Sequence, residues 1–197
     1  MAEPAKRLAT YADLEAAPPN LVAEIIHGAL VTHPRPVAGH AGAQNNLSAT
    51  LTPGYHWGRG GPGGWRFLSE PELHLGAHVV VPDLAGWRVE RMPREPRKAQ
   101  ITVPPDWLCE ILSDGTEKYD RGAKRGIYAE AGIPFLWLLD PRARLLEVFQ
   151  LTAGHWLLAA TFSNDQEVRA LPFEATPFPL TQLWPFDPDR DTNEDKS

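Results

Sequence analysis

The sequence has little capacity for covalent cross-linking and no segment suited to a membrane. It contains a single cysteine, Cys109, in 197 residues, so no internal disulfide can form. Its longest apolar runs, such as the one at residues 135–139, are far shorter than the ~20 residues of a membrane-spanning helix. The first residues lack the apolar stretch of a secretory signal. We therefore expect a cytoplasmic protein with no membrane partner.

The length and composition predict one folded domain. Hydrophobic residues make up 43% and charged residues 22% of the chain, which is ordinary for a globular protein. A chain of 197 residues is large enough to bury a core but short for two full domains. Residues 187–197 are polar and mostly acidic, and too poor in apolar side chains to fold. We expect a single domain over residues 1–186 and a disordered acidic tail over residues 187–197.

The formal net charge of −6 excludes a protein that coats nucleic acid by bulk electrostatic attraction. Basic residues nevertheless gather in two segments, at residues 88–98 and 118–125. Each segment is either a local contact for a polyanion or a solvated face.

Hydrophobic periodicity and turn residues predict a mixture of helices and strands. Helices are expected at residues 11–17, 38–52 and 116–131, with Pro53 ending the second. A hairpin is expected over residues 21–32, with its turn at His27 and Gly28. Further strands are expected at residues 65–68, 72–75, 78–81, 84–89, 107–112, 134–139, 145–151 and 156–162. Residues 171–188 predict an irregular apolar strap that covers another surface or another subunit.

Glu110 is the most informative residue because it lies inside an apolar strand, Trp-Leu-Cys-Glu-Ile-Leu. Alternation along a strand puts Glu110 on the same face as Leu108 and Leu112, and Cys109 on the opposite face. A buried carboxylate is costly unless a cation or hydrogen-bond donor meets it. That partner is either a metal ion or a lysine or arginine from a neighbouring element.

Asp83 follows an apolar strand and Pro82, and it precedes a second apolar strand. Alone, the Pro-Asp pair is typical of a turn. Together with Glu110, Asp83 could hold a hard divalent cation, and Lys124 on the following helix could stabilise charge on a phosphate. Asp120, Lys124 and Tyr128 recur every four residues and so share one helix face, where an ion pair and a packed ring are the alternative.

These residues resemble a known family. Pro82-Asp83, Glu110-Ile-Leu-Ser, the Asp120, Lys124 and Tyr128 series and Gly-Ile-Pro-Phe-Leu-Trp-Leu-Leu-Asp-Pro from residue 132 are similar to the Uma-two family of endonucleases. Glu-Ile-Ile-His-Gly from residue 24 and His40 are further matches. That family belongs to the PD-(D/E)xK, or restriction-endonuclease-like, superfamily, and the resemblance covers about residues 8–151.

The resemblance implies an α/β (α+β) fold, a mixed central sheet flanked by helices with extra β-hairpins. It implies a DNA endonuclease dependent on Mg²⁺ or Mn²⁺, with Asp83 and Glu110 as metal ligands and Lys124 as the catalytic lysine. Leu112 stands where the wider superfamily has lysine, and the family moves this lysine to the following helix. His27 and Ala29 replace acids that are usual in the early hairpin.

Four residues are expected in accessory roles. The resemblance implies an early acid near the site, so Glu24 is either an accessory carboxylate or a surface residue. His40 is either a ligand or proton-transfer group or a hydrogen-bonded core histidine. Asp120 and Tyr128 are expected to orient Lys124.

Other functions remain open from the sequence. The same fold could serve as a catalytically weak or inactive scaffold that binds nucleic acid or oligomerises. A cupin-like metal protein, with histidines on a β-rich frame, is a third alternative. DNA is the expected substrate, and the seven tryptophans and Pro- and Phe-rich segments predict a homodimer or higher homo-oligomer.

Overall fold

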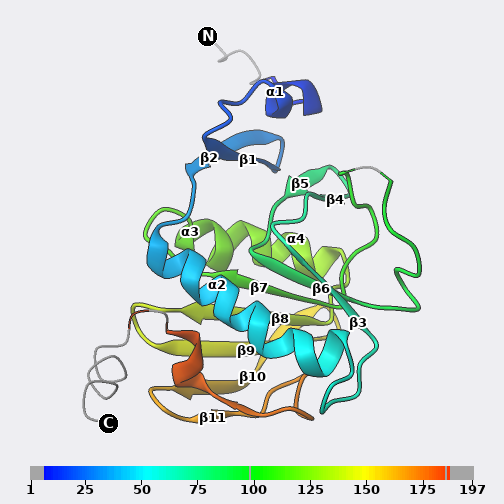
Figure 1. Ribbon diagram of the computed structural model, residues 1–197. Helices are drawn as coiled ribbons and strands as arrows, with labels where there is room; N and C mark the ends of the chain where they lie inside the picture. Colours follow the sequence, from blue (N-terminus) through cyan, green and yellow to red (C-terminus); the bar gives the residue numbers. More distant parts are fainter. Residues whose placement is uncertain (1–6, 98, 185, 187–197) are drawn as a thin grey trace.

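A mixed six-stranded sheet forms the centre of the molecule (Figure 1). The computed structural model describes residues 7–97, 99–184 and 186, so the expected tail at 187–197 lies outside the described residues. The strand order is β10-β9-β8-β7-β6-β3, in which only β7 and β8 are parallel neighbours. The strands are β3 (Trp65–Ser69), β6 (Leu84–Arg88), β7 (Trp107–Ile111), β8 (Phe135–Asp140), β9 (Leu145–Thr152) and β10 (His155–Ser163).

Two smaller antiparallel sheets accompany the central one. The first has the order β2-β1-β5-β4, and the second pairs β11 with β12. His27 and Gly28 connect β1 to β2 with φ angles of 49° and 73°, so the turn lies where the sequence predicts it. The strands are β1 (Leu21–Ile26), β2 (Ala29–Pro34), β4 (Leu73–Leu75), β5 (His78–Val80), β11 (Glu167–Val168) and β12 (Phe178–Pro179).

The helices lie where the periodicity predicts them, but two of them are followed or interrupted by irregular turns. The α-helix that starts at Ala38 ends at Leu51, just before Pro53, and the chain then continues as a π turn in which Thr52 C=O accepts a bond from Trp57 N–H. The third helix is interrupted at Gly122, whose backbone is not helical. The elements are α1 (Tyr11–Glu15), α2 (Ala38–Leu51), η1 (Thr52–His56), α3 (Glu117–Tyr119), η2 (Asp120–Lys124), α4 (Arg125–Glu130) and η3 (Leu180–Leu183).

One face of the central sheet is covered by α2 and by the C-terminal strap at residues 168–184 (Figure 1). Phe173 lies at the centre of this layer, with its ring 4.9 Å from that of Trp65, 5.1 Å from Trp107 and 5.6 Å from Trp137. The Trp137 indole N–H also donates to Leu171 C=O at 2.7 Å. The strap therefore covers the protein's own core.

The opposite face of the sheet packs against α4 and the small four-stranded sheet. Leu108 and Leu112 of the β7 segment belong to this second apolar cluster, whereas Cys109 belongs to the first. Glu110 lies between Leu108 and Leu112 in the sequence and is also buried, as the alternation along the strand predicts. The mixed sheet with helices on both faces differs from the β-rich frame that the cupin-like alternative requires. Across the described residues, no helix combines the length and apolar character needed to span a bilayer.

The strap yields a stability prediction. We expect Phe173→Ala to lower the free energy of unfolding by about 3–5 kcal/mol, because it empties a cavity among large aromatic rings that cannot collapse easily. Urea denaturation followed by tryptophan fluorescence measures the change. Leu8→Ala is the control, since Leu8 is 69% exposed and should change stability little. Equal effects of the two substitutions would contradict a central role for the strap.

Candidate functional site

Asp83 and Glu110 come from neighbouring strands of the central sheet. Asp83 immediately precedes β6, and the antiparallel register pairs the next residue, Leu84, with Cys109 of β7. One carboxylate oxygen of Asp83, Oδ2, accepts the Ile111 N–H at 2.6 Å. The pairing of β6 with β7 thus brings Asp83 and Glu110 to the same end of these two strands. Their assignment as metal ligands stays a prediction.

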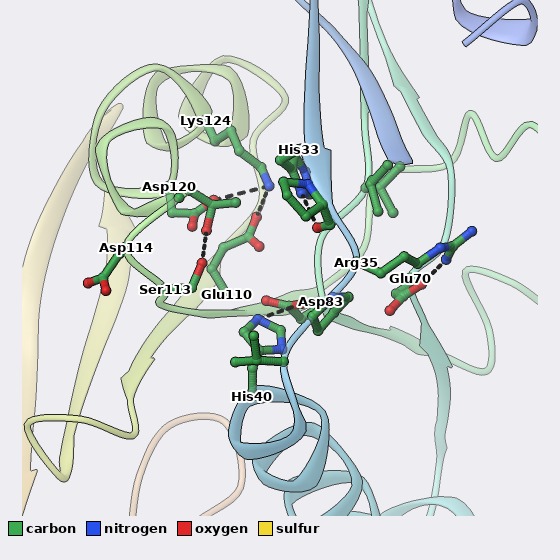
Figure 2. Close-up of a pocket in the computed structure, with 17 residues that line it drawn as sticks. His33, Arg35, His40, Glu70, Asp83, Glu110, Ser113, Asp114, Asp120 and Lys124 are labelled. Atoms are coloured by element: carbon green, nitrogen blue, oxygen red, sulfur yellow. Dashed lines mark hydrogen bonds and ion pairs between the residues drawn. The ribbon is translucent and has the colours of Figure 1, made fainter. Parts of the chain in front are cut away.

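Lys124 lies in a buried cluster of three carboxylates. Its Nζ is 2.9 Å from Glu110 Oε1 and 3.2 Å from Asp120 Oδ1 (Figure 2). It is also 3.3 Å from Glu24 Oε1. The lysine side chain is 3% exposed, and each of the three acids is equally enclosed. Because these acids come from β1, β7 and η2, the ammonium of Lys124 connects the four-stranded and the six-stranded sheets to the helical layer.

The acids of this cluster have further hydrogen-bond partners. The Tyr128 hydroxyl donates a short hydrogen bond to Glu110 Oε1. Glu24 Oε1 accepts the Val81 N–H at 2.8 Å, and Glu24 Oε2 lies 3.5 Å from His33 Nε2. These contacts fix the carboxylates from several elements, so their positions do not depend on the lysine alone.

The environment shifts the pKa values of the cluster in opposite directions. Burial raises the pKa of Glu110 well above its usual range, although the charge of Lys124 opposes this. Burial also raises the pKa of Asp120, again against Lys124. Burial acts the same way on Glu24, but the Lys124 charge and the bonds from His33 and Val81 outweigh it and lower the pKa of Glu24 to about 2.

The base of the cluster is held in its charged form. Burial alone would lower the pKa of Lys124, but Glu110 and Glu24 outweigh burial and raise that pKa well above its usual range. The cluster therefore holds one fixed positive charge among three acids, and burial favours the protonated form of Glu110 and Asp120.

His40, near the start of α2, contacts the other oxygen of Asp83. Its Nε2 lies 3.2 Å from Asp83 Oδ1 (Figure 2), and its side chain is 9% exposed. Burial lowers the pKa of His40, but the hydrogen bond and charge of Asp83 outweigh it, so the pKa is raised. His40 Nδ1 is buried with no hydrogen-bond partner among the described residues. His40 and the Ile111 N–H together orient both carboxylate oxygens of Asp83.

These residues face a pocket of about 250 Å³. It is bounded by the segment between β2 and α2, by the start of α2 and by the loop that follows β7 (Figure 2). The polar and charged residues that line it are His33, Arg35, His40, Glu70, Asp83, Glu110, Ser113, Asp114, Thr116, Asp120 and Lys124. Glu24 contacts Lys124 and Tyr128 contacts Glu110, but neither Glu24 nor Tyr128 lines the pocket.

Comparison with known proteins agrees with this architecture. The sequence model of the Uma2 family, described as "Putative restriction endonuclease", matches residues 8–181. The chain belongs to the Uma2 family. A crystal structure from Anabaena variabilis ATCC 29413, described as a "putative nuclease belonging to DUF820", is similar over 89% of this chain and 97% of its own, with a TM-score of 0.66 and 21% identity. That similarity shows a shared fold. No curated protein matches the sequence.

The structure of this Uma2 protein agrees with the idea that a helix carries the lysine. Leu112, two residues after Glu110, is 2% exposed in the apolar cluster and offers no cation. The ammonium near Glu110 comes from η2. The catalytic role of Lys124 stays a prediction.

Sequence reasoning missed three groups that position the site. The Gln44 side-chain amide donates to Asp83 C=O at 2.7 Å, and the Glu70 N–H donates to the same carbonyl at 3.0 Å. Glu70 adopts a φ of 47°, which is uncommon for a residue other than glycine. His33 is the third group, beside Glu24. Gln44 follows His40 by one helical turn, so the i,i+4 spacing could have indicated it; nothing local indicates the other two.

The lowered pKa of Glu24 generates a prediction about acid stability. Folding lowers this pKa from 4.5 to about 2, so ionised Glu24 contributes about 3 kcal/mol at neutral pH. This contribution is complete above the unfolded-state pKa and is lost as the pH falls from 4.5 toward 2. We expect Glu24→Gln to reduce the free energy of unfolding at neutral pH by about this amount. The difference from wild type should shrink across that acidic window.

Chemical denaturation at a series of pH values between neutral and about 3 measures this effect. Glu167→Gln is the control, because the Glu167 side chain is 65% exposed in an ion pair with Arg169. A difference between wild type and Glu24→Gln that does not vary with pH would contradict the assignment of Glu24 as an ionised buried acid.

Proposed function

We propose that this Uma2 protein is a DNA endonuclease dependent on Mg²⁺ or Mn²⁺. It would hydrolyse a phosphodiester with water as the nucleophile: a bond from water oxygen to phosphorus forms, the bond to one ester oxygen breaks, and that oxygen leaves with a proton. The observation that carries the proposal is an excess of acidic over basic side chains in and beside the pocket. Glu24, Glu110 and Asp120 surround one ammonium, that of Lys124, and Asp83 adds a fourth carboxylate beside them.

The donor set suits a hard divalent cation. Mg²⁺ and Mn²⁺ prefer carboxylate oxygens, and Mg²⁺ usually keeps several waters and takes only one or two carboxylates from the protein. Asp83 and Glu110 supply such a pair from adjacent strands. Within residues 7–97, 99–184 and 186, no three His, Cys, Asp or Glu side chains are gathered as a ready-made metal cage. The proposal therefore requires water and substrate oxygens to complete the coordination.

The remaining residues act by position and charge. When bound, the metal would supply Lewis acidity to the scissile phosphate and to the attacking water. Lys124 would stabilise negative charge that develops on the phosphate. His40 and Gln44 hold Asp83 at its carboxylate and its carbonyl, and Tyr128 holds Glu110, so both acids are preorganised.

A second candidate function rests on the closure of the lysine cluster. The ammonium of Lys124 is 3% exposed and contacts three carboxylates, so it is unavailable to a substrate in this arrangement. This favours, as the alternative, a catalytically weak or inactive scaffold that binds nucleic acid. Binding of DNA without cleavage in any divalent metal is the result that distinguishes it.

The proposed metal site predicts a loss of divalent binding in a charge-neutral variant. We expect Glu110→Gln to weaken Mn²⁺ binding by about 100-fold or more, because it removes an anionic oxygen ligand from a buried position. Isothermal titration calorimetry with MnCl₂ measures the dissociation constant.

Asp114→Asn is the matched control for this titration. Asp114 lines the same pocket, but its side chain is 93% exposed and pairs with Arg142. We expect Asp114→Asn to bind Mn²⁺ almost as tightly as wild type. Equal affinity of wild type and Glu110→Gln would rule out Glu110 as a ligand.

The proposed role of Lys124 predicts a loss of cleavage. We expect Lys124→Met to reduce metal-dependent nicking of supercoiled plasmid by at least 100-fold, since the charge that stabilises the phosphate is gone. The substitution also leaves three buried acids without their cation, which costs about 3–5 kcal/mol of stability. Near-UV circular dichroism must therefore confirm that the variant is folded at the assay temperature.

Two further variants complete this test. Lys118→Met is the control, because Lys118 is an exposed lysine on the adjacent α3 and should leave cleavage unchanged. Asp83→Asn removes the part-exposed carboxylate without disturbing the lysine cluster, and it should also abolish cleavage. Wild-type cleavage by a folded Lys124→Met protein would leave the lysine without a catalytic role.

Two expectations from the sequence stay predictions. A homodimer is favoured by the exposed side chains of Leu157 and Leu158 on the edge strand β10. A cytoplasmic location follows from the proposed DNA substrate and the single buried thiol of Cys109.

A further inference from the structure

Arg35 is the one well-exposed cationic side chain among the residues that line the pocket. Five carboxylates line this pocket, whereas its only lysine, Lys124, is 3% exposed and enclosed. The Arg35 side chain is 58% exposed. A phosphodiester strand that enters the pocket therefore meets repulsion from the acids and one accessible guanidinium.

The backbone presents Arg35 from a rigid segment. Pro34, the last residue of β2, and Pro36 flank it on either side. Proline fixes its own φ and restricts the preceding residue to extended conformations, so the position of the Arg35 backbone varies little. The long side chain keeps its freedom to exchange partners at the mouth of the pocket.

The present partner of Arg35 is a replaceable one. Arg35 Nη1 lies 3.4 Å from Glu70 Oε2, a single long contact in which the Glu70 side chain is 33% exposed (Figure 2). Exposed ion pairs of this kind contribute little stability. Glu70 is itself anchored, because its N–H donates to Asp83 C=O. Glu70 is therefore bonded through its backbone to Asp83, a proposed metal ligand, and its carboxylate holds the Arg35 guanidinium at the pocket. An incoming anion could replace that carboxylate.

We propose that Arg35 binds a backbone phosphate of the DNA substrate, exchanging the Glu70 carboxylate for phosphate oxygens. The planar guanidinium can donate two parallel hydrogen bonds to a phosphate, which a lysine cannot do. This proposal rests on the proposed nuclease function and assigns its substrate contact to a residue outside the carboxylate cluster. Arg35 acts in binding, and the bond-breaking step is left to Asp83, Glu110 and Lys124.

The test measures binding without cleavage. Fluorescence anisotropy of a fluorescein-labelled DNA duplex is titrated with the full-length protein over a range of salt concentrations, once in EDTA and once in CaCl₂ as a divalent cation. We expect Arg35→Ala to weaken binding about 10-fold and to reduce the slope of log K against log[salt] by about one, the loss of one phosphate contact. Arg35→Lys should keep the slope and recover only part of the affinity.

A substitution that is expected to tighten DNA binding, rather than weaken it, completes the test. Glu70→Gln retains the backbone bond to Asp83 but removes the competing charge, so it should tighten binding several-fold. Arg169→Ala is the matched control. The Arg169 side chain is 60% exposed and pairs with Glu167 at the same distance of 3.4 Å, but it does not line the pocket, so affinity and slope should stay unchanged.

The outcomes separate this proposal from the nuclease function. An Arg35→Ala protein with wild-type affinity and slope overturns it, as does a wild-type protein with no measurable DNA binding either in EDTA or in CaCl₂. A wild-type protein that binds DNA through Arg35 but cleaves it in neither Mg²⁺ nor Mn²⁺ supports the contact and overturns the nuclease. In a cleaving protein, Arg35→Ala should raise KM about 10-fold and leave kcat within about twofold.

Discussion

The buried ammonium of Lys124 is the interaction on which the site depends. Its three carboxylate partners belong to the hairpin of β1 and β2, to the central strand β7 and to the same helical segment as the lysine. Burying a charge in this way is costly, and a buried ion pair is not by itself a large source of stability. Its value lies instead in specificity, because the ammonium meets all three acids only when hairpin, sheet and helix lie together. We infer that the cluster fixes the orientation of the hairpin on the domain.

The sheet supplies the second constraint. Asp83 lies where β5 has ended and β6 begins, and its three oxygen atoms all have partners: Oδ1 meets His40, Oδ2 meets the Ile111 N–H, and the carbonyl meets Gln44 and Glu70. The contacts come from α2, β7 and the β3–β4 connection. A side chain held from three directions needs little reorganisation when a ligand binds. Proline at position 82 is compatible with this role, because it precedes the strand and removes no ladder hydrogen bond there.

The local sequence pattern was sufficient to predict the alternation of β7 and the turn between β1 and β2. The alternation in residues 107–112 places Glu110 and Cys109 on opposite faces, and the turn at His27 and Gly28 follows from their sequence. The family resemblance supplied the fold and the expectation that Lys124, rather than a residue at position 112, provides the ammonium. The α-helix ends just before Pro53 as predicted, but the π turn that follows it was not expected.

Long-range contacts were beyond the sequence. His33 reaches Glu24 only through the pairing of β1 with β2, and Arg35 meets Glu70 across thirty-five positions of sequence. The sequence left open whether the strap covers another surface of the chain or another subunit, because its prolines and aromatics show apolar character but not what they pack against. In the structure, Phe173 fills the space among tryptophans from three different strands. Packing of this kind is decided by tertiary shape, which hydrophobic periodicity does not record.

The charges at the pocket also affect how metal binding and DNA binding depend on each other. Without a cation, the acids that line the pocket repel a polyanionic strand, and the single exposed guanidinium offsets only part of that repulsion. Under the proposed function, Asp83 and Glu110 would hold a divalent ion that offsets part of this negative charge and competes with Lys124 for the Glu110 carboxylate. Lys124 would then be held less tightly by Glu110 and would be freer to contact a phosphate. The same excess of carboxylates that encloses the lysine in the free protein would thus make its release conditional on the metal, which couples metal binding to substrate binding.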